Sequence, residues 1–163
     1  MLRRKKKIEG EVKKPRKEYF FGDVKCDSSL EVYCHKKLVE AGLAYDFHPK
    51  SFVLLNGFTS LPVSLEPDER IGKLLSLKTE KIRPITYQID FADPKLRWMI
   101  ETKGYARSEF SIRWKLFKYR LSQEGIRTTL FLPKDHPQVD NAIRLILEMK
   151  LDRHMSAESP TLF

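Results

Sequence analysis

Apolar positions spaced by three and four residues run from Leu30 to Ala41, which is the periodicity of one face of an α-helix. Asp27 and Ser28 precede this pattern and are suited to cap its start, while Gly42 is suited to end it. We therefore predict a first helix between Ser28 and Gly42.

Strand-forming residues dominate the next stretch, residues 45–55, with an interruption at His48 and Pro49. The turn signal Asn56-Gly57 is predicted to close this strand. Residues 58–81 mix proline, charged and apolar positions without a clear period, and no element is predicted there.

Two β-rich segments, residues 85–91 and 96–103, flank the turn signal Ala92-Asp93-Pro94-Lys95. We predict that they form a hairpin. A helix then begins at Ser108 and ends at Gly125, with its apolar stripe at Phe110, Trp114, Phe117 and Leu121.

A last strand is predicted over residues 126–132, followed by a helix capped by Asp135 or His136 with Pro137 in its first turn. The order is therefore helix, three strands, helix, strand, helix, which indicates an α/β protein of α+β type, with a mixed sheet and helices on its faces. We predict one domain over residues 21–152 and a frayed tail at 153–163.

Charge is concentrated at the N-terminus. Residues 1–20 carry nine Lys or Arg against three Glu, so they contribute +6 to the formal net charge of +9. This basic arm is predicted to stay disordered, and it is either a solubilising tail or a nucleic-acid-binding arm that includes Arg3, Arg4, Lys5, Lys6 and Lys7.

The chain lacks an apolar stretch of the roughly 20 residues that span a bilayer, and no signal-peptide pattern begins it. We expect an intracellular protein that does not contact a membrane, in the cytoplasm of a bacterial or other host cell. Its two cysteines, Cys26 and Cys34, are expected to be reduced, and the histidines have no structural-zinc spacing.

The predicted hairpin carries the candidate chemistry. In the strand 96–103 the side-chain period of two places Glu101 and Lys103 on one face, and Asp90 lies near the end of the preceding strand. If the two carboxylates converge, a divalent cation would offset their repulsion, and Mg²⁺ binds a few carboxylates together with water and phosphate oxygens. The set then suits phosphodiester hydrolysis, with Lys103 placing the attacking water.

Each residue also has a simpler interpretation. Ser28 and Glu31 match a capping box, in which the glutamate only caps the first helix. Asp90 could be an aspartate leading into a turn, and Glu101 with Lys103 could be a surface ion pair worth less than about 1 kcal/mol.

The ordered set resembles a known motif. The sequence IDF at 89–91, a short spacer, IETKG at 100–104 and the preceding SSLE at 28–31 are similar to the PD-(D/E)XK nuclease superfamily, closest to the phage endonuclease I family of Holliday-junction resolvases and related small phage nucleases. The resemblance covers residues 27–132 and implies a restriction-endonuclease-like αβββαβ core, here with an extra C-terminal helix. Ile89 stands where the motif usually has proline.

The resemblance also implies residue roles. Asp90, Glu101, the backbone carbonyl of Thr102 and, as an ancillary ligand, Glu31 would hold Mg²⁺, for which Mn²⁺ would substitute. Glu31, Asp90, Glu101 and Lys103 would form the catalytic set. Lys103 would orient the water.

A second basic concentration follows this set: residues 95–120 contain eight Lys or Arg and two acidic residues, a charge of +6. We interpret it as a surface for DNA phosphates rather than only a solvated helix face. The residues assigned to this surface are Arg107, Arg113, Lys115, Lys118 and Arg120.

The sequence thus predicts a Mg²⁺-dependent DNA endonuclease, with branched or four-way DNA as the substrate and a homodimer as the assembly that the resemblance implies. A catalytically inactive DNA-binding protein on the same fold is the alternative. A structural or partner-binding protein is a third, and it would leave both basic regions without affinity for DNA.

Overall fold

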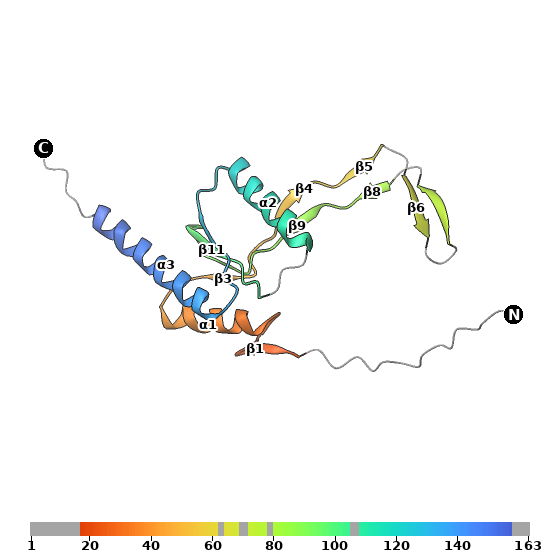
Figure 1. Cartoon of the computed structure of the whole chain (residues 1–163). Coiled ribbons are helices and arrows are strands. Elements are labelled where there is room, and N and C mark those ends of the chain that lie inside the picture. The colour runs from red at the N-terminus through yellow and green to blue at the C-terminus, as the bar shows by residue number, and fades with distance from the viewer. Residues whose placement is uncertain (1–16, 62–63, 69–71, 78–79, 105–107, 158–163) are drawn as a thin grey trace, which may run out of the picture.

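The computed structural model describes residues 17–61, 64–68, 72–77, 80–104 and 108–157 (Figure 1). The predicted arm residues Arg3, Arg4, Lys5, Lys6 and Lys7, together with Arg107, lie outside these ranges. So do residues 158–163 of the predicted tail.

A four-stranded sheet forms the centre of the molecule, in the order β12-β11-β10-β3. β10 pairs antiparallel with both β3 and β11, whereas β11 pairs parallel with β12, so the sheet is mixed as predicted. The parallel pair is joined through a helix, as such connections require. The bounds are β3 Asp46–Phe47, β10 Phe91–Ala92, β11 Trp98–Ile100 and β12 Thr129–Phe131.

The described residues contain three helices, and all three were predicted from their apolar periodicity. Their bounds are α1 Ser29–Glu40, α2 Ser108–Gln123 and α3 His136–Ala157. The Ser28 hydroxyl accepts a hydrogen bond from the Glu31 amide at the start of α1, and the Asp135 carboxylate accepts one from the Gln138 amide at the start of α3. α3 continues to Ala157, beyond the point at which the tail was predicted to fray.

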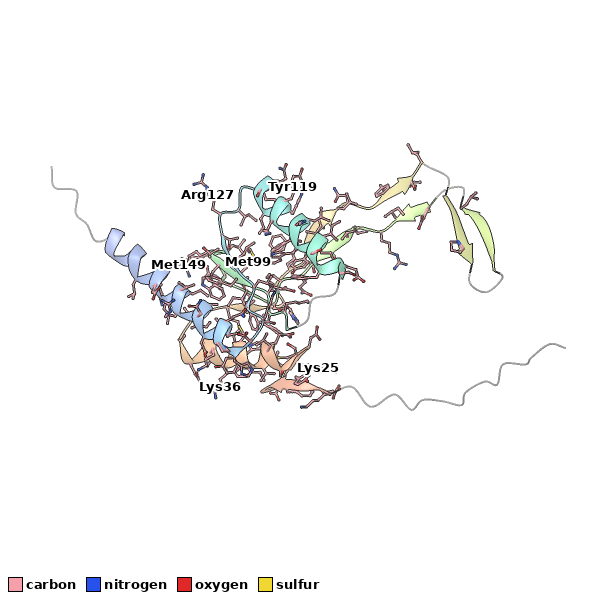
Figure 2. The ribbon with its side chains drawn as sticks, viewed as in Figure 1. Lys25, Lys36, Met99, Tyr119, Arg127 and Met149 are labelled. Carbon is pink, nitrogen blue, oxygen red and sulfur yellow. The ribbon has the colours of Figure 1, made fainter. Side chains whose placement is uncertain are left out.

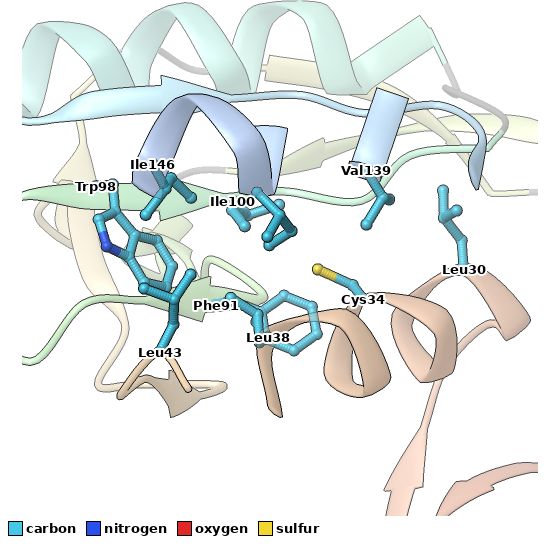
Figure 3. Packing of buried hydrophobic residues seen from close by; sticks show 10 residues of the cluster. Leu30, Cys34, Leu38, Leu43, Phe91, Trp98, Ile100, Val139 and Ile146 are labelled. Atoms are coloured by element: carbon cyan, nitrogen blue, oxygen red, sulfur yellow. The ribbon is translucent and has the colours of Figure 1, made fainter. Parts of the chain in front are cut away.

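The helices cover both faces of the sheet, and each face has its own apolar cluster. On one face, Leu38 of α1 and Val139 of α3 pack on the sheet residues Phe91 and Ile100 (Figure 3). On the other face, Phe117 of α2 packs in a second cluster. Fully burying a large apolar side chain contributes about 1.5–3 kcal/mol, so these two clusters stabilise the three layers.

Figure 2 shows how the side chains divide between these layers and the surface. Met99 points from β11 into the buried α2 cluster, whereas Lys36 on α1 and Tyr119 on α2 project to the exterior. The three residues of β11 are all buried because the strand has neighbours on both sides and helices on both faces.

Two hairpins lie outside the predicted core. The first pairs β1 Tyr19–Phe21 with β2 Val24–Cys26 through Gly22, whose φ of 56° suits a glycine. β1 begins at Tyr19, so the last two residues of the segment assigned to the basic arm lie in a strand.

The second is a two-stranded ribbon, which we call the β-ribbon, formed by the described strands between Phe52 and Tyr87. It projects from the body of the molecule (Figure 1). Its pairs are β4 with β9, β5 with β8 and β6 with β7, all antiparallel. The Asn56-Gly57 signal therefore does not reverse the chain, and the segment without a sequence assignment forms most of the β-ribbon. The bounds are β4 Phe52–Leu55, β5 Phe58–Ser60, β6 Ser64–Asp68, β7 Lys73–Leu77, β8 Glu80–Ile82 and β9 Ile85–Tyr87.

Within the described ranges, none of the helices is both long and apolar enough to cross a bilayer. Cys26 and Cys34 are free thiols, and both are buried.

His35 of α1 is buried among aromatic rings, with an exposed fraction of 2%. Its Nδ1 lies 2.8 Å from the Tyr45 hydroxyl, its ring stacks on Phe21, and its buried Nε2 has no hydrogen-bond partner. Burial, together with nearby His48, lowers the pKa of His35 from 6.5 to about 4. The native state therefore holds this imidazole neutral.

We expect this burial to destabilise the protein in acid. Because the folded-state pKa lies below the unfolded value, the stabilisation is complete above about pH 6.5 and is lost as the pH falls toward about 4. Urea unfolding of the wild type and of His35→Phe, which does not titrate, should show their stability difference shifting by roughly 3 kcal/mol over this interval. Parallel pH profiles would contradict the prediction.

Candidate active site

The register of the β10–β11 hairpin sets Asp90 beside Glu101. Phe91 of β10 lies opposite Ile100 of β11, so one step further along each strand Asp90 and Glu101 are opposite each other. Side chains alternate between faces along a strand, which places Glu101 on the same face as Met99, the one covered by α2. Asp90 lies just before β10, and its carboxylate reaches Thr102.

This register depends on the turn, which lies two residues later than predicted. Asp93 donates its amide to the Trp98 carbonyl at 3.0 Å and so still pairs as a strand residue. Its buried carboxylate accepts hydrogen bonds from the amides of Lys95 and Arg97 and from the Arg97 guanidinium, and these bonds lower its pKa. Leu96 takes a φ of 54° within the turn.

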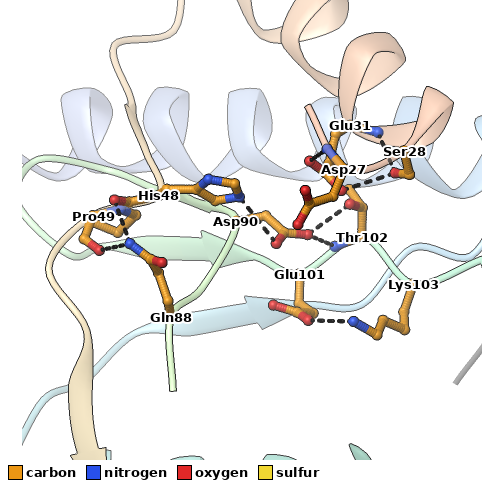
Figure 4. Close-up of polar contacts among 10 residues, drawn as sticks. All are labelled: Asp27, Ser28, Glu31, His48, Pro49, Gln88, Asp90, Glu101, Thr102 and Lys103. Atoms are coloured by element: carbon orange, nitrogen blue, oxygen red, sulfur yellow. Dashed lines mark hydrogen bonds and ion pairs between the residues drawn. The ribbon is translucent and has the colours of Figure 1, made fainter. Parts of the chain in front are cut away.

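Asp90 is held by the neighbouring strand. Its Oδ2 accepts hydrogen bonds from both the amide and the hydroxyl of Thr102, each at 2.7 Å, and its Oδ1 lies 3.9 Å from Nε2 of His48 (Figure 4). Burial raises the pKa of Asp90 despite the two bonds from Thr102. Thr102 thus contacts the site through these two donors, and a ligand role for its carbonyl stays a prediction.

Glu101 is a buried carboxylate whose hydrogen bonds are incomplete. It is only 3% exposed, its Oε1 lies 3.4 Å from Nζ of Lys103, and its Oε2 is buried without a hydrogen-bond partner. Burial raises the pKa of Glu101 to about 7, and the negative charge of Asp90 contributes to the increase. The two carboxylates are thus close enough to repel each other.

Lys103 lies between the acidic groups and α2. Its amide donates to the Pro133 carbonyl at 2.9 Å, which keeps the chain beside β12 after β11 has ended. The ammonium group reaches Glu101 and lies 5.2 Å from the centre of the Phe110 ring. The predicted juxtaposition of Asp90, Glu101 and Lys103 is therefore present.

Glu31 makes the contacts expected of a cap. Its carboxylate accepts hydrogen bonds from the Asp27 amide at 2.8 Å and the Ser28 hydroxyl at 3.0 Å, and it is buried. Burial raises its pKa, and the charge of Asp90 raises it further. Figure 4 shows Glu31 behind Asp27, on the α1 side of Asp90.

A pocket of about 500 Å³ opens over the carboxylates on the α2 face. Acidic, basic and aromatic side chains share it, which is the environment of a polar ligand with an anionic part. It is lined by Asp27, His48, Tyr87, Gln88, Asp90, Glu101, Lys103, Glu109, Phe110 and Arg113.

Six pocket residues were not singled out as site residues from the sequence: Asp27, His48, Tyr87, Gln88, Glu109 and Phe110. His48 has a φ of 46°, and its amide donates to the Asp90 carbonyl at 2.8 Å. The strand break at His48-Pro49 was the only signal for it. The buried Tyr87 hydroxyl has no hydrogen-bond partner, and burial together with nearby Glu101 raises its pKa. Gln88 donates to the carbonyls of His48 and Pro49.

The basic residues of α2 divide into two groups. Arg113 lines the pocket and donates to the Thr86 carbonyl of β9. Lys115 and Lys118 are exposed and lie outside the pocket lining, and Arg120 pairs with Glu124. Only Arg113 of the predicted basic residues within the described ranges therefore faces the candidate site.

In the part of the chain that the structure describes, no group of three carboxylate, imidazole or thiol side chains is placed to hold a metal ion. Asp90 and Glu101 by themselves still suit Mg²⁺, which usually takes one or two carboxylates and completes its shell with water and phosphate oxygens. The buried, unpartnered Oε2 of Glu101 is the atom that such an ion would satisfy.

Comparison of the chain with protein-family models, with curated proteins and with solved structures finds no match. The fold and the geometry of the site therefore carry the functional argument.

Proposed function

We propose that this chain is a Mg²⁺-dependent DNA endonuclease. The observation that supports it most is the pair of carboxylates formed by buried Glu101 and partly buried Asp90, with the ammonium group of Lys103 beside them in one pocket. A buried carboxylate with one unpartnered oxygen is costly for folding, and such costs are concentrated at functional sites.

The order of elements supports the same class. Without the β-ribbon, the chain reads α1, β3, β10, β11, α2, β12, and β11 and β12 are parallel neighbours. This order is compatible with the αβββαβ core that the sequence motif implies, and it supports the proposal. Asp90 immediately precedes β10 and Glu101 immediately follows β11.

Each residue has a role in the proposed reaction. Asp90, fixed by the two donors of Thr102, and Glu101 would hold Mg²⁺. The ion, when bound, supplies positive charge against the scissile phosphate and makes a water more acidic. Lys103 is placed to orient the attacking water, and Arg113 at the pocket wall can contact a phosphate oxygen. Glu31 supports the site through α1.

Branched DNA is the substrate that the resemblance favours, and the test compares DNA structures. Purified protein is incubated with linear, nicked, flapped and four-way DNA in Mg²⁺, Mn²⁺ or chelator. We expect cleavage only with a divalent cation, and faster cleavage of branched substrates.

The outcomes separate the alternatives. Tight binding of every DNA without cutting in either metal would support the inactive DNA-binding protein. Absence of both binding and cleavage would favour a partner-binding role. Cleavage in chelator would overturn the metal-dependent mechanism.

A further inference from the structure

The middle of the β-ribbon carries a concave surface that is separate from the pocket over the carboxylates. It encloses about 670 Å³ at the junction where the β4–β9 pair gives way to the β5–β8 pair. Its lining contains two basic side chains and no carboxylate. The lining residues are Gly57, Phe58, Thr59, Lys81, Ile82, Arg83 and Pro84.

The two basic side chains, Lys81 and Arg83, are exposed and pair with no acidic residue within the described ranges. Lys81 of β8 and Arg83 just after it both line the concave surface, whereas neighbouring Glu80 does not. Exposed cations that lack a partner in the chain are available to an external anion. Two of them on one concave surface suit a polyanion better than a single charge does.

The backbone at this junction is shaped by Gly57. A Cβ atom there would lie 2.9 Å from the Ile82 carbonyl oxygen and 3.1 Å from Cδ of Pro84, closer than such atoms approach. The glycine thus lets the two strands come together, and Phe58, which is 49% exposed, borders the concave surface. An exposed ring beside two cations can contact a sugar edge while the cations contact phosphates.

We infer that Phe58, Lys81 and Arg83 form a DNA-binding site, the ribbon site, that contacts phosphates away from the scissile bond. The inference rests on the proposed function, because it takes DNA as the ligand. A two-stranded β-ribbon fits the major groove of B-DNA. Lys81 lies six residues from Tyr87 of the catalytic pocket, or roughly 20 Å of extended strand, which corresponds to about six base pairs.

A second copy of the chain is a weaker candidate for this surface. A two-fold contact would place the same residues of both copies against each other, so Lys81 and Arg83 would meet the same cations of the second copy. DNA supplies the opposite charge at regular spacing along its backbone. We therefore assign the ribbon site to DNA.

The test is a salt titration of DNA binding with Lys81→Ala/Arg83→Ala. Fluorescence anisotropy is measured with a duplex of about 30 base pairs in chelator, so that cleavage plays no part. Removing two phosphate contacts should weaken binding about tenfold at moderate salt and lower the slope of log K against log salt by about 2.

Two further variants make the result specific. Lys81→Arg/Arg83→Lys keeps both charges and should keep the wild-type slope. Lys36→Ala/Arg144→Ala removes two exposed charges from α1 and α3, where they pair with Glu40 and Glu148, and should leave the slope unchanged. Circular dichroism confirms that each variant is folded.

Phosphate-ethylation interference on the same duplex locates the contact. The cleavage position is mapped afterwards by adding Mg²⁺ to the wild type. Ethylation of a phosphate about six base pairs from that position should weaken DNA binding by the wild type but not by the Lys81→Ala/Arg83→Ala variant. An unchanged salt slope in the Lys81→Ala/Arg83→Ala variant overturns the inference. If the sedimentation coefficient of this variant also changes, the surface is a contact between copies of the chain. Cleavage by the wild type in Mg²⁺ is scored separately, so the proposed function can stand when the ribbon site fails.

Discussion

Glu101→Gln should abolish DNA cleavage in Mg²⁺ while leaving DNA binding in chelator unchanged. The amide keeps the shape of the side chain but removes the charge that would hold the ion, and losing such transition-state stabilisation, about 4 kcal/mol, slows the reaction roughly a thousandfold. Single-turnover cleavage of a labelled substrate measures the effect. Glu148→Gln on α3, where Glu148 pairs with Arg144 at the surface, is the matched control and should cleave normally.

The proposed role of Lys103 is to orient the attacking water, and this role does not require it to bind the ion. Lys103→Ala should lose a comparable fraction of activity at every Mg²⁺ concentration, whereas the loss in Glu101→Gln should depend on the metal concentration. Lys103→Arg, which keeps a donor, should recover part of the rate. Full activity in Lys103→Ala would overturn the role assigned to its amine.

The Glu101→Gln variant should also be more stable than the wild type at alkaline pH. Because the pKa of Glu101 is raised from 4.5 to about 7, its protonated form is the one that the native state favours. The favourable contribution is complete below about pH 4.5, and it is lost as the pH rises to about 7. At pH 8, the free energy of unfolding of Glu101→Gln should therefore exceed that of the wild type by roughly 3 kcal/mol.

Urea unfolding from pH 4 to pH 8.5 in chelator measures this difference. The two proteins should be nearly equally stable at pH 4 and should diverge as the pH rises. Adding Mg²⁺ at pH 8 should stabilise the wild type and narrow the gap, because an ion that binds only the native state shifts the equilibrium toward it. Identical pH profiles would show that Glu101 ionises without cost.

The helices could be predicted from the sequence because their stability is encoded locally. Ser28 and Gly42 bound an apolar stripe of the right period, and the structure places α1 between them. The three-strand order and the parallel pairing after α2 follow similarly, since a helix between two strands favours a parallel connection. What remained open was the position of each turn.

The hairpin shows why the site was harder to predict than the fold. With a turn at residues 92–95, Asp90 would lie opposite Arg97 and far from Glu101. The carboxylate of Asp93 organises the turn two residues later by binding amides within it, and this shift aligns the two acidic residues. A preference for Pro94 in a turn does not reveal that one side chain will bind the amides of the residues that follow.

The β-ribbon was missed for a different physical reason. Only its base packs on the core, through Phe52, Leu54 and Tyr87. Farther out, exposed residues such as Phe58 and Leu65 do not alternate with polar ones in a way that marks a buried face. A bulge between Val53 and Leu55 interrupts the period further. Pairing between the two strands, rather than burial of one face, holds this segment together.

The β-ribbon leaves the body at Phe52 and returns beside it at Tyr87, because these two residues pair. To the rest of the molecule, the whole excursion is a single short connection between β3 and β10. The part of it beyond Phe52, Leu54 and Tyr87, which pack in the α2 cluster, could be lengthened, trimmed or replaced without moving the pocket residues. Under the proposed function, such changes would alter the DNA structures that the protein accepts while the carboxylates stay the same.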